Sequence, residues 1–470
     1  MPAHSSRLPD PLVSALAARF GDRFSTSLAI REHHGKDESS GPPVPPDAVV
    51  FAESTEEVSA AVALCHANRV PVIAFGTGTS LEGHLHAVRG GICIDLSRMN
   101  RVQAIRPGDL DATVEAGVTR KALNAALHGS GLFFPIDPGA DASLGGMAAT
   151  RASGTNAVRY GTMREAVLAT TVVLADGRII KTGTRAKKSS AGYDLTRLFV
   201  GSEGTLGIIT ELTVRLHPLP EAIASALCAF PAIAAAVDTV IQTIQLGIPV
   251  ARIEILDSLS IRAINRYSRT SLREAPTLFF ELHGSPASVA EQTQALRDLA
   301  SDHGGMDFEW ADQPEDRSRL WQARHDAYYA CLGLAPGSRS LTTDVCVPIS
   351  RLADCIAATL ADLDETGLVA PLLGHVGDGN FHLLVLVRPG DDAQLARARA
   401  FTQRLAERAI AMDGTCTGEH GIGVGKRKYM LAEHGEGALS VMRAVKQALD
   451  PHNLMNPGKI LPDRCPPDSA

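Results

Sequence analysis

Apolar and polar positions between residues 48 and 75 follow two different periods. AVVFA (48–52) and VPVIAF (70–75) are short apolar runs of strand length, whereas the stretch from Thr55 to Asn68 repeats apolar side chains at helical spacing. STEE, at the start of the helical stretch, has the spacing of a capping box. The pattern predicts a strand, a helix and a second strand, which begin a mixed α/β domain.

From Glu221 onward the apolar periods predict longer elements. Helical spacing occupies 235–246, 289–304 and 320–330, and strand-like patterns occupy 251–257 and 277–284. Helices and strands then alternate to about Leu449. We therefore expect a second domain in which helices cover an antiparallel sheet. A turn from Asp450 onward should return the chain to the first domain.

The first 41 residues have a different character. They begin with the spacing of a short amphipathic helix capped near Asp10, and the stretch from Arg31 is rich in Pro, Ser and charge, which predicts an extended arm. The start lacks the apolar core of a secretory signal, and no apolar run is long enough to span a bilayer. We expect a cytoplasmic protein without a transmembrane segment; a peripheral contact with a membrane stays open.

Two apolar runs flank Asp378 and Gly379 in PLLGHVGDGNFHLLVLV (371–387). Asp-Gly in this position favours a two-residue type I′ hairpin, which would set His375 opposite His382. Opposed residues on one face have Cβ atoms roughly 4.5–5.5 Å apart, so both imidazoles could hold one metal ion. The alternative is a pair of ordinary half-buried histidines.

A third ligand is needed to complete such a site. Glu419 and His420 stand together in the glycine-rich TGEHGIGVGK (417–426), where the backbone can approach a bound group closely. They are the best candidates. On the helix predicted at 320–330, Arg324 is a fixed cation of the kind that binds a carboxylate, although most helix arginines are simply solvated.

Three segments rich in small residues fall within the first domain, at 76–83, 137–161 and from Phe199 to about Pro220. The first follows a strand and offers a nest of backbone N–H donors suited to a pyrophosphate. It has neither the Rossmann spacing of glycines nor the ending of a P-loop. Together the three segments favour a dinucleotide over a set of tightly packed turns.

Composition narrows the class of protein. The 470 residues are 45% hydrophobic and 21% charged, and the net charge of −7 argues against a nucleic-acid partner. The length exceeds what one core usually serves. The eight cysteines contain no CxxC, which suits free thiols in a reducing compartment.

Nine segments in order resemble the flavin-dependent D-2-hydroxyacid dehydrogenases of the vanillyl-alcohol oxidase superfamily, and most closely its cytochrome-linked D-lactate dehydrogenases. They span about Val44 to Leu461 and read PVIAFGTGTSLEG, VEAGVTRKALNAAL, FPIDPGADASLGGMAATRASGTNAVRYGTMREAVL, GYDLTRLFVGSEGTLGIIT, ARHDAYYA, TDVCVPISRL, GHVGDGNFH, GEHGIGVGK and LMNPGKIL.

The resemblance implies an α+β fold in four parts. An N-terminal helix and arm (1–41) would precede a two-subdomain FAD-binding domain of the p-cresol methylhydroxylase (PCMH) type (42–219). A cap domain (220–449) would carry an antiparallel sheet covered by helices and bind the substrate and the metal. Residues 450–470 would return to the FAD domain.

The resemblance also implies the residues that bind FAD, which we expect to be held non-covalently although His84 and His86 follow the first glycine loop. The pyrophosphate would lie against Gly76, Thr77, Gly78, Thr79 and Ser80. The flavin and adenine channel would be lined by Pro138, Gly139, Ser143, Gly146, Ser153, Gly154, Thr155, Ala157, Glu203, Gly207, Ile209 and Asn456.

In metal-containing relatives the matching positions make His375, His382 and Glu419 the ligands of a divalent ion, for which Zn²⁺ and Mn²⁺ are both suitable. Arg324 would then bind the substrate carboxylate, and the metal would lower the pKa of the 2-hydroxyl. His420 would take the hydroxyl proton while hydride passes to flavin N5. Electrons would leave to a cytochrome or a quinone rather than to NAD.

One difference from a branch of this family limits the size and charge of the substrate that we expect. In the 2-hydroxyglutarate branch of the family an Asn follows the second histidine by two residues, on the same strand face; here that position is Leu384. An apolar side chain cannot help to hold a second carboxylate, so D-lactate or a similar short D-2-hydroxy acid fits better. The alternatives are a glycolate oxidase flavin subunit, a D-2-hydroxyglutarate dehydrogenase and a non-catalytic flavoprotein. The oligomeric state is left open.

Overall fold

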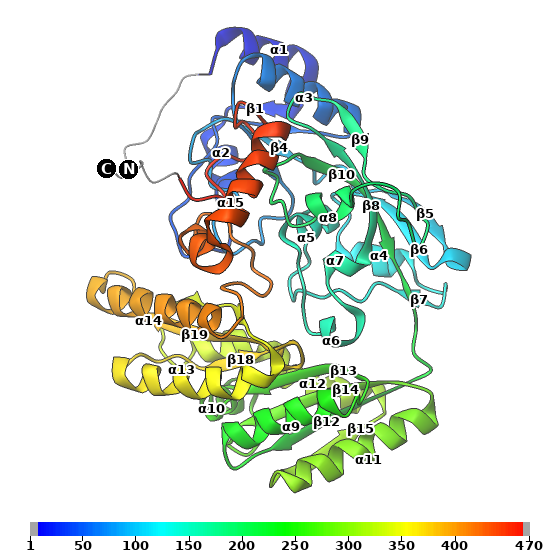
Figure 1. The fold of residues 1–470 in the computed structure, drawn as a ribbon, viewed down its shortest axis with the longest axis vertical. Helices are drawn as coiled ribbons and strands as arrows, with labels where there is room; N and C mark the ends of the chain where they lie inside the picture. Colours follow the sequence, from blue (N-terminus) through cyan, green and yellow to red (C-terminus); the bar gives the residue numbers. More distant parts are fainter. Residues whose placement is uncertain (1–7, 464–470) are drawn as a thin grey trace. The chain divides into compact units, whose positions relative to one another are not determined.

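The computed structural model describes residues 8–463, which fold into two compact units (Figure 1). Among the described residues, the first unit holds 8–153, 161–219 and 419–463; the second holds 154–160 and 220–418. The boundary at 220 falls where the sequence predicts it. Residues 419–449, which we expected in the cap domain, group instead with the first unit.

The first unit contains a four-stranded sheet in the order β1-β2-β4-β3. The predicted strand, helix and strand are present as β2 (Ala48–Phe51), α3 (Thr55–Ala67) and β3 (Val72–Phe75), and β4 (Ile92–Asp95) lies between the two strands, parallel to both. The Ser54 side chain accepts a hydrogen bond from the Glu57 N–H, so the predicted N-terminal cap of α3 is confirmed.

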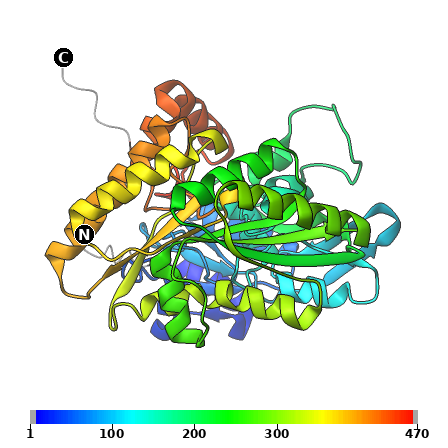
Figure 2. The same ribbon diagram turned by 90° about the horizontal axis from the view of Figure 1, so that it is seen from below.

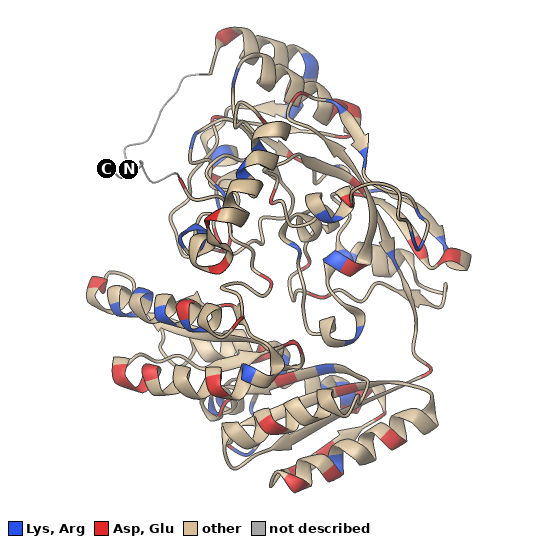
Figure 3. Ribbon diagram, in the orientation of Figure 1, with Lys and Arg blue, Asp and Glu red and all other residues tan. Residues whose placement is uncertain are grey.

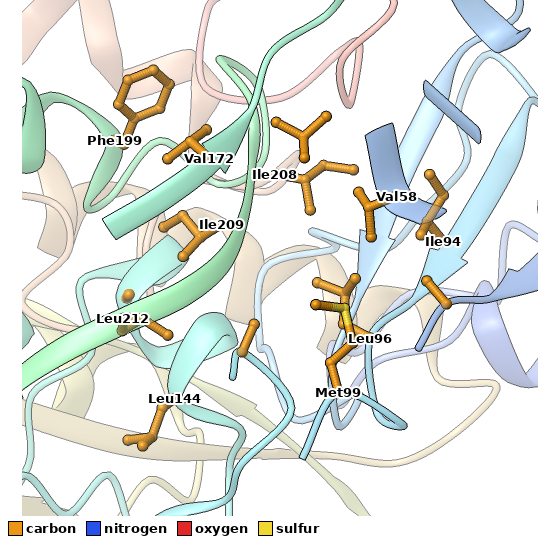
Figure 4. Close-up of a cluster of buried hydrophobic side chains, with 14 of the residues drawn as sticks. Val58, Ile94, Leu96, Met99, Leu144, Val172, Phe199, Ile208, Ile209 and Leu212 are labelled. Atoms are coloured by element: carbon orange, nitrogen blue, oxygen red, sulfur yellow. The ribbon is translucent and has the colours of Figure 1, made fainter. Parts of the chain in front are cut away.

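A second, antiparallel sheet of the first unit has the order β5-β6-β10-β8-β9. Its strands are β5 (Val102–Arg106), β6 (Asp111–Glu115), β8 (Val167–Val173), β9 (Ile179–Lys181) and β10 (Ile208–Arg215). Helix α3 contacts β4 of the first sheet and both β8 and β10 of the second. Figure 4 shows Val58 of α3 within this shared core, with Ile94 from one sheet and Val172, Ile208 and Leu212 from the other.

The remaining helices and strands complete the first unit. They are α1 (Asp10–Phe20), β1 (Phe24–Ser25), α2 (Leu28–His34), α4 (Arg120–Ala126), β7 (Leu132–Phe133), α5 (Leu144–Thr150), α7 (Met163–Ala166), α8 (Leu195–Phe199), β11 (His217–Pro218) and α15 (Met430–Leu449).

Helix α1 begins at Asp10 with Pro9 at the cap position, in agreement with the cap predicted near Asp10. One detail of the N-terminal prediction is wrong. Residues 31–34, which we expected in the extended arm, form the end of helix α2. The buried His34 ring contacts the Asp95 carboxylate (Nε2 to Oδ2, 2.8 Å) and anchors this helix to the first sheet. A tertiary contact of this kind leaves no mark in local composition.

The second unit is built on an eight-stranded antiparallel sheet in the order β15-β12-β14-β13-β18-β19-β16, with β17 also paired to β19. The strands are β12 (Ala222–Ala229), β13 (Val250–Leu256), β14 (Thr277–Gly284), β15 (Met306–Ala311), β16 (Arg339–Thr342), β17 (Val345–Cys346), β18 (Leu372–Gly374) and β19 (Asn380–Val387). The antiparallel sheet expected for this part of the chain is confirmed.

Helices cover both faces of this sheet (Figure 2). One face packs against α9 (Ile233–Gln245), α11 (Pro286–Asp302), α13 (Leu352–Thr366) and α14 (Asp392–Ala411), and the other against α10 (Ser258–Ser268) and α12 (Pro314–Leu332). Successive strand residues point to opposite faces, so Phe280 joins the first core and its neighbour Phe279 the second. The short helix α6 (Ala157–Tyr160) packs on β13.

The chain returns to the first unit at Glu419, earlier than the predicted turn at Asp450. Helix α15 ends at Leu449, and the Val72 backbone of β3 then exchanges hydrogen bonds with Leu454 and Asn456. Lys, Arg, Asp and Glu are interspersed along the helices of each unit (Figure 3), as the modest net charge leads one to expect. No helix among residues 8–463 is long and apolar enough to cross a membrane.

Candidate active site

The predicted hairpin around Asp378 and Gly379 is wrong in its register. Leu373, rather than His375, lies opposite His382, and residues 375–379 form a five-residue connection. A type I′ turn needs positive φ at both central residues, but of the two only Gly379 has it (φ 79°). The shift is two residues, which preserves the strand face.

His375 and His382 nevertheless lie together, with ring centroids 5.4 Å apart. His382 Nδ1 is 2.9 Å from the Thr343 carbonyl oxygen, and His375 Nδ1 is 2.7 Å from Glu254 Oε1. A carbonyl and a carboxylate only accept hydrogen bonds, so each Nδ1 carries the proton. The lone pair of each ring is therefore on Nε2, the state in which imidazole binds a metal.

Glu254, in the middle of β13, joins His375 to Arg324 of α12. Its Oε2 accepts from Arg324 Nε and Nη2, both at 2.8 Å. The carboxylate is fully buried. Although burial alone would raise its pKa, His375 and Arg324 outweigh burial and hold the pKa of Glu254 below its usual range.

Asp344 supports the same end of β19. Its carboxylate is buried and accepts hydrogen bonds from the Asn380 side chain and the Thr417 hydroxyl, both at 2.8 Å. Neither Glu254 nor Asp344 was among the site residues predicted from the sequence. Glu254 could have been found, because a single carboxylate between isoleucines in a buried strand needs a partner.

Glu419 and His420 open the last segment of the first unit, in a loop held by two carboxylate residues. Glu203 accepts hydrogen bonds from the backbone N–H groups of Ile422 (2.7 Å) and Gly423 (2.8 Å). Gly421 has φ 82°, and a Cβ there would lie 2.8 Å from Glu203 Oε1, so only glycine fits. The loop that carries His420 is thus fixed by its backbone.

Glu82 holds the other side of this loop. Its carbonyl oxygen accepts from the N–H groups of Val424 (2.8 Å) and Gly425 (3.0 Å). Its Oε1 lies 3.5 Å from His420 Nδ1 and 3.3 Å from Lys426 Nζ. The His420 ring is thereby oriented with Nδ1 toward a carboxylate.

Two of the predicted FAD segments meet in the first unit. Residues 76–80 follow β3, and a Cβ on Gly76 would lie 2.3 Å from Ser143 Oγ. The Ser143 N–H donates to Thr77 Oγ1 (3.4 Å). The buried hydroxyls of Ser143 and Ser202 have no hydrogen-bond partner among the described residues. Close glycine backbone and unsatisfied hydroxyls suit a ligand rich in acceptors, such as a dinucleotide.

The other residues predicted to line the flavin do not all lie in one part of the fold. Pro138, Gly139 and Ser153 lie outside helices and strands, and Gly146 lies in α5. Gly154, Thr155 and Ala157 group with the second unit. Gly207 and Ile209 belong to the core: a Cβ on Gly207 would lie 2.6 Å from Val172 Cγ1, and Ile209 is buried.

Glu203 and Asn456 join the chain end to a buried polar cluster. Asn456 Nδ2 donates to the carbonyl oxygens of His84 (3.1 Å) and Glu203 (2.7 Å). Glu203 Oε1 lies 3.4 Å from His84 Nε2. Burial opposes the charged form of His84, but the Glu203 carboxylate outweighs burial and raises the pKa of His84.

The first unit thus combines two sheets that share one core with glycine-rich loops suited to a dinucleotide. Residues 46–183 match the family model described as FAD binding domain, and residues 219–460 match that of FAD linked oxidases, C-terminal domain. The chain belongs to the FAD-linked oxidases, and its cofactor is FAD.

Named proteins of similar sequence support the same family. The chain is 55% identical to "Probable D-lactate dehydrogenase, mitochondrial" of Danio rerio, over 96% of this chain and 91% of that one. It is 47% identical to "D-lactate dehydrogenase [cytochrome], mitochondrial" of Arabidopsis thaliana, over 97% and 81%. The fold is similar to that of 4-ethylphenol oxidase from Gulosibacter chungangensis, with a TM-score of 0.77 at 20% identity over 97% and 99% of the two chains.

Proposed function

We propose that this chain is an FAD-dependent dehydrogenase that oxidises D-lactate, or a similar short D-2-hydroxy acid, to the 2-oxo acid. The names of the two relatives, at 55% and 47% identity over nearly the whole chain, support the substrate class. The observation that carries the chemistry is the pair of histidines whose Nδ1 atoms are both committed to acceptors.

We infer that His375, His382 and Glu419 bind a divalent metal, Zn²⁺ or Mn²⁺. Two imidazoles and one carboxylate suit either ion. The covalent chain supports the third ligand: a Cβ on Gly418 would lie 2.3 Å from Asn380 Nδ2, two residues before His382. Glu419 follows Gly418 by one trans peptide, about 3.8 Å from Cα to Cα. The covalent bond to Gly418 therefore keeps the Glu419 backbone within one residue of this end of β19, which supports Glu419 as the third ligand.

The chain's own residues then have distinct roles. Arg324 binds the substrate carboxylate and so orients C2. His420, whose Nδ1 faces Glu82, takes the proton of the 2-hydroxyl at Nε2. A bound FAD would supply the acceptor for the hydride of C2, and a metal held by the two histidines would supply Lewis acidity that lowers the pKa of the hydroxyl.

Leu384 supports a short substrate. It is buried on β19, two residues past His382, in the apolar cluster that also contains Ala323 and Ala327 of α12, the helix that carries Arg324. A second carboxylate near this cluster would lose its hydration without gaining a partner.

The name of the Arabidopsis thaliana relative supports a cytochrome as electron acceptor, with a quinone as the alternative. Both relatives are named mitochondrial, so the relatives do not support the cytoplasmic location expected from the sequence. That location stays a prediction, as does any peripheral membrane contact.

Anaerobic mixing of the FAD-loaded protein with four acids tests the proposal. D-lactate should bleach the flavin absorbance, L-lactate should not, and D-2-hydroxyglutarate and glycolate should do so more slowly. Faster bleaching by glycolate would replace the proposal with a glycolate oxidase activity. Faster bleaching by D-2-hydroxyglutarate would contradict the role given to Leu384.

A further inference from the structure

Glu254 is a buried carboxylate on a strand whose neighbouring residues are apolar. Its side chain is fully buried, and its neighbours Ile253 and Ile255 on β13 are buried in the core of the opposite face. A buried carboxylate without partners would be strongly destabilising, so its retention depends on the groups around it. Those groups are His375, for which we propose metal binding, and Arg324, for which we propose binding of the substrate carboxylate.

Each oxygen of Glu254 serves one partner. Oε1 contacts His375 Nδ1 at 2.7 Å, and Oε2 accepts both Nε and Nη2 of Arg324 at 2.8 Å. One side of the guanidinium is thereby fixed, which directs Nη1 away from the carboxylate. One side of the imidazole is fixed as well, which directs Nε2 away.

We propose that Glu254 is a positioning residue that sets the metal-binding tautomer of His375 and the orientation of Arg324 at the same time. This inference rests on the proposed function, in which His375 binds the metal and Arg324 binds the substrate carboxylate. One rigid strand residue thus holds the two binding groups at a constant separation. Partners that orient ligating histidines commonly contribute roughly 10- to 100-fold to metal affinity.

An amide in place of the carboxylate separates this role from a merely structural one. Glutamine offers one acceptor and one donor, and Arg324 can only donate, so the amide oxygen must face Arg324 and the amide N–H₂ must face His375. His375 Nδ1 then accepts, and the ring proton moves to Nε2. That tautomer cannot bind a metal through Nε2, although the side-chain volume is unchanged.

The matched control is Glu281→Gln. Glu281 is a buried carboxylate on the neighbouring strand β14, and it contacts a different histidine (His283 Nε2 to Oε1, 2.8 Å) and a different arginine (Arg252 Nε to Oε1, 3.4 Å) from those of Glu254. It reproduces the loss of a buried charge without altering the proposed metal site.

The experiment measures Zn²⁺ and Mn²⁺ affinity of chelator-treated, FAD-loaded protein by metal titration, and measures propionate affinity by the change in flavin absorbance. Glu254→Gln should lower metal affinity roughly 10- to 100-fold, with FAD content retained. Glu281→Gln should leave metal affinity within about threefold of the wild type. Arg324→Met should keep the metal and lose at least tenfold in propionate affinity, and this variant carries the test if Glu254→Gln does not fold.

Three results would overturn the assignment of Glu254: unchanged metal affinity in Glu254→Gln, an equal loss in Glu281→Gln, or loss of the metal in Arg324→Met. A wild-type protein that binds neither metal would overturn the proposed metal site and this inference together. The wild type therefore tests the proposed function, and the variants test Glu254.

Discussion

His382 illustrates how a single hydrogen bond determines what a side chain can do. Its Nδ1 donates to the Thr343 carbonyl, so the neutral ring presents its lone pair at Nε2. The spacing of the histidines can be read along the chain, but a backbone carbonyl 39 residues away leaves no trace in a local pattern. The sequence alone indicates the two histidines as candidate ligands, but it does not indicate which ring nitrogen carries the proton.

The substitution His420→Ala tests whether His420 is the general base. Because the loop is held through backbone N–H groups by Glu203 and Glu82, loss of the ring should leave the loop and bound FAD in place. The rate of flavin reduction by D-lactate should fall roughly 10²- to 10⁴-fold, as is typical when a general base is removed. Rapid-mixing absorbance measures the rate, and the flavin content of the purified variant is the control. Undiminished reduction would exclude His420 as the base.

The elements of the protein were predicted best where local rules agree with tertiary packing. Helix α3 has both a capping side chain and an apolar face, and it begins where the sequence places it. The Asp-Gly signal failed because Gly379 is used elsewhere: its carbonyl accepts from the Val347 N–H, and a Cβ on Gly379 would lie 2.1 Å from the Val347 carbonyl oxygen. A segment well before it in the chain thus determines the turn.

The cap of α3 can be tested by Ser54→Ala. Removal of the hydroxyl leaves the Glu57 N–H without its acceptor, which should cost about 1 kcal/mol. The midpoint temperature of FAD release should fall by roughly 2–4 °C. Ser54→Asp, which retains an acceptor, should remain close to the wild type. Equal midpoints for the wild type and Ser54→Ala would show that the cap contributes nothing.

At the scale of the whole molecule, the placement of 419–449 could not have been read from composition. An amphipathic pattern such as that of α15 does not tell which core the helix packs on; in the structure Val445 and Leu449 pack on the core of the first unit, and Lys446 Nζ donates to the Thr205 carbonyl (2.7 Å). The resemblance over nine segments identified the cofactor correctly. It could not identify Glu254, which lies outside those segments, because a supporting residue on another strand is recognised only once the strands are placed.

Lys459 gives a prediction about how stability depends on pH. It holds the chain end in the first unit by donating to the His86 carbonyl (2.6 Å) and Asn456 Oδ1 (2.9 Å). Burial lowers its pKa from 10.5 to about 7. Between these two pH values the unfolded chain binds more protons than the folded chain, so this residue makes stability rise with pH.

The midpoint temperature of the wild type minus that of Lys459→Met should therefore increase as pH rises from about 7 toward 10, within the window set by the two pKa values. Thermal unfolding of the FAD-loaded protein in a series of buffers measures the difference. Lys187→Met, at an exposed position, should show no such trend. A difference for Lys459→Met that stays flat or falls with pH would contradict the lowered pKa.

Oxidation of D-lactate at a metal held by His375, His382 and Glu419 is tested by anaerobic rapid mixing of chelator-treated, FAD-loaded protein with D-lactate. We predict that the flavin is reduced only after Zn²⁺ or Mn²⁺ is added, and that His382→Ala, with its FAD retained, is not reduced with or without metal. Full-rate reduction of the metal-free protein, or of His382→Ala, would show that D-lactate is oxidised without this metal site.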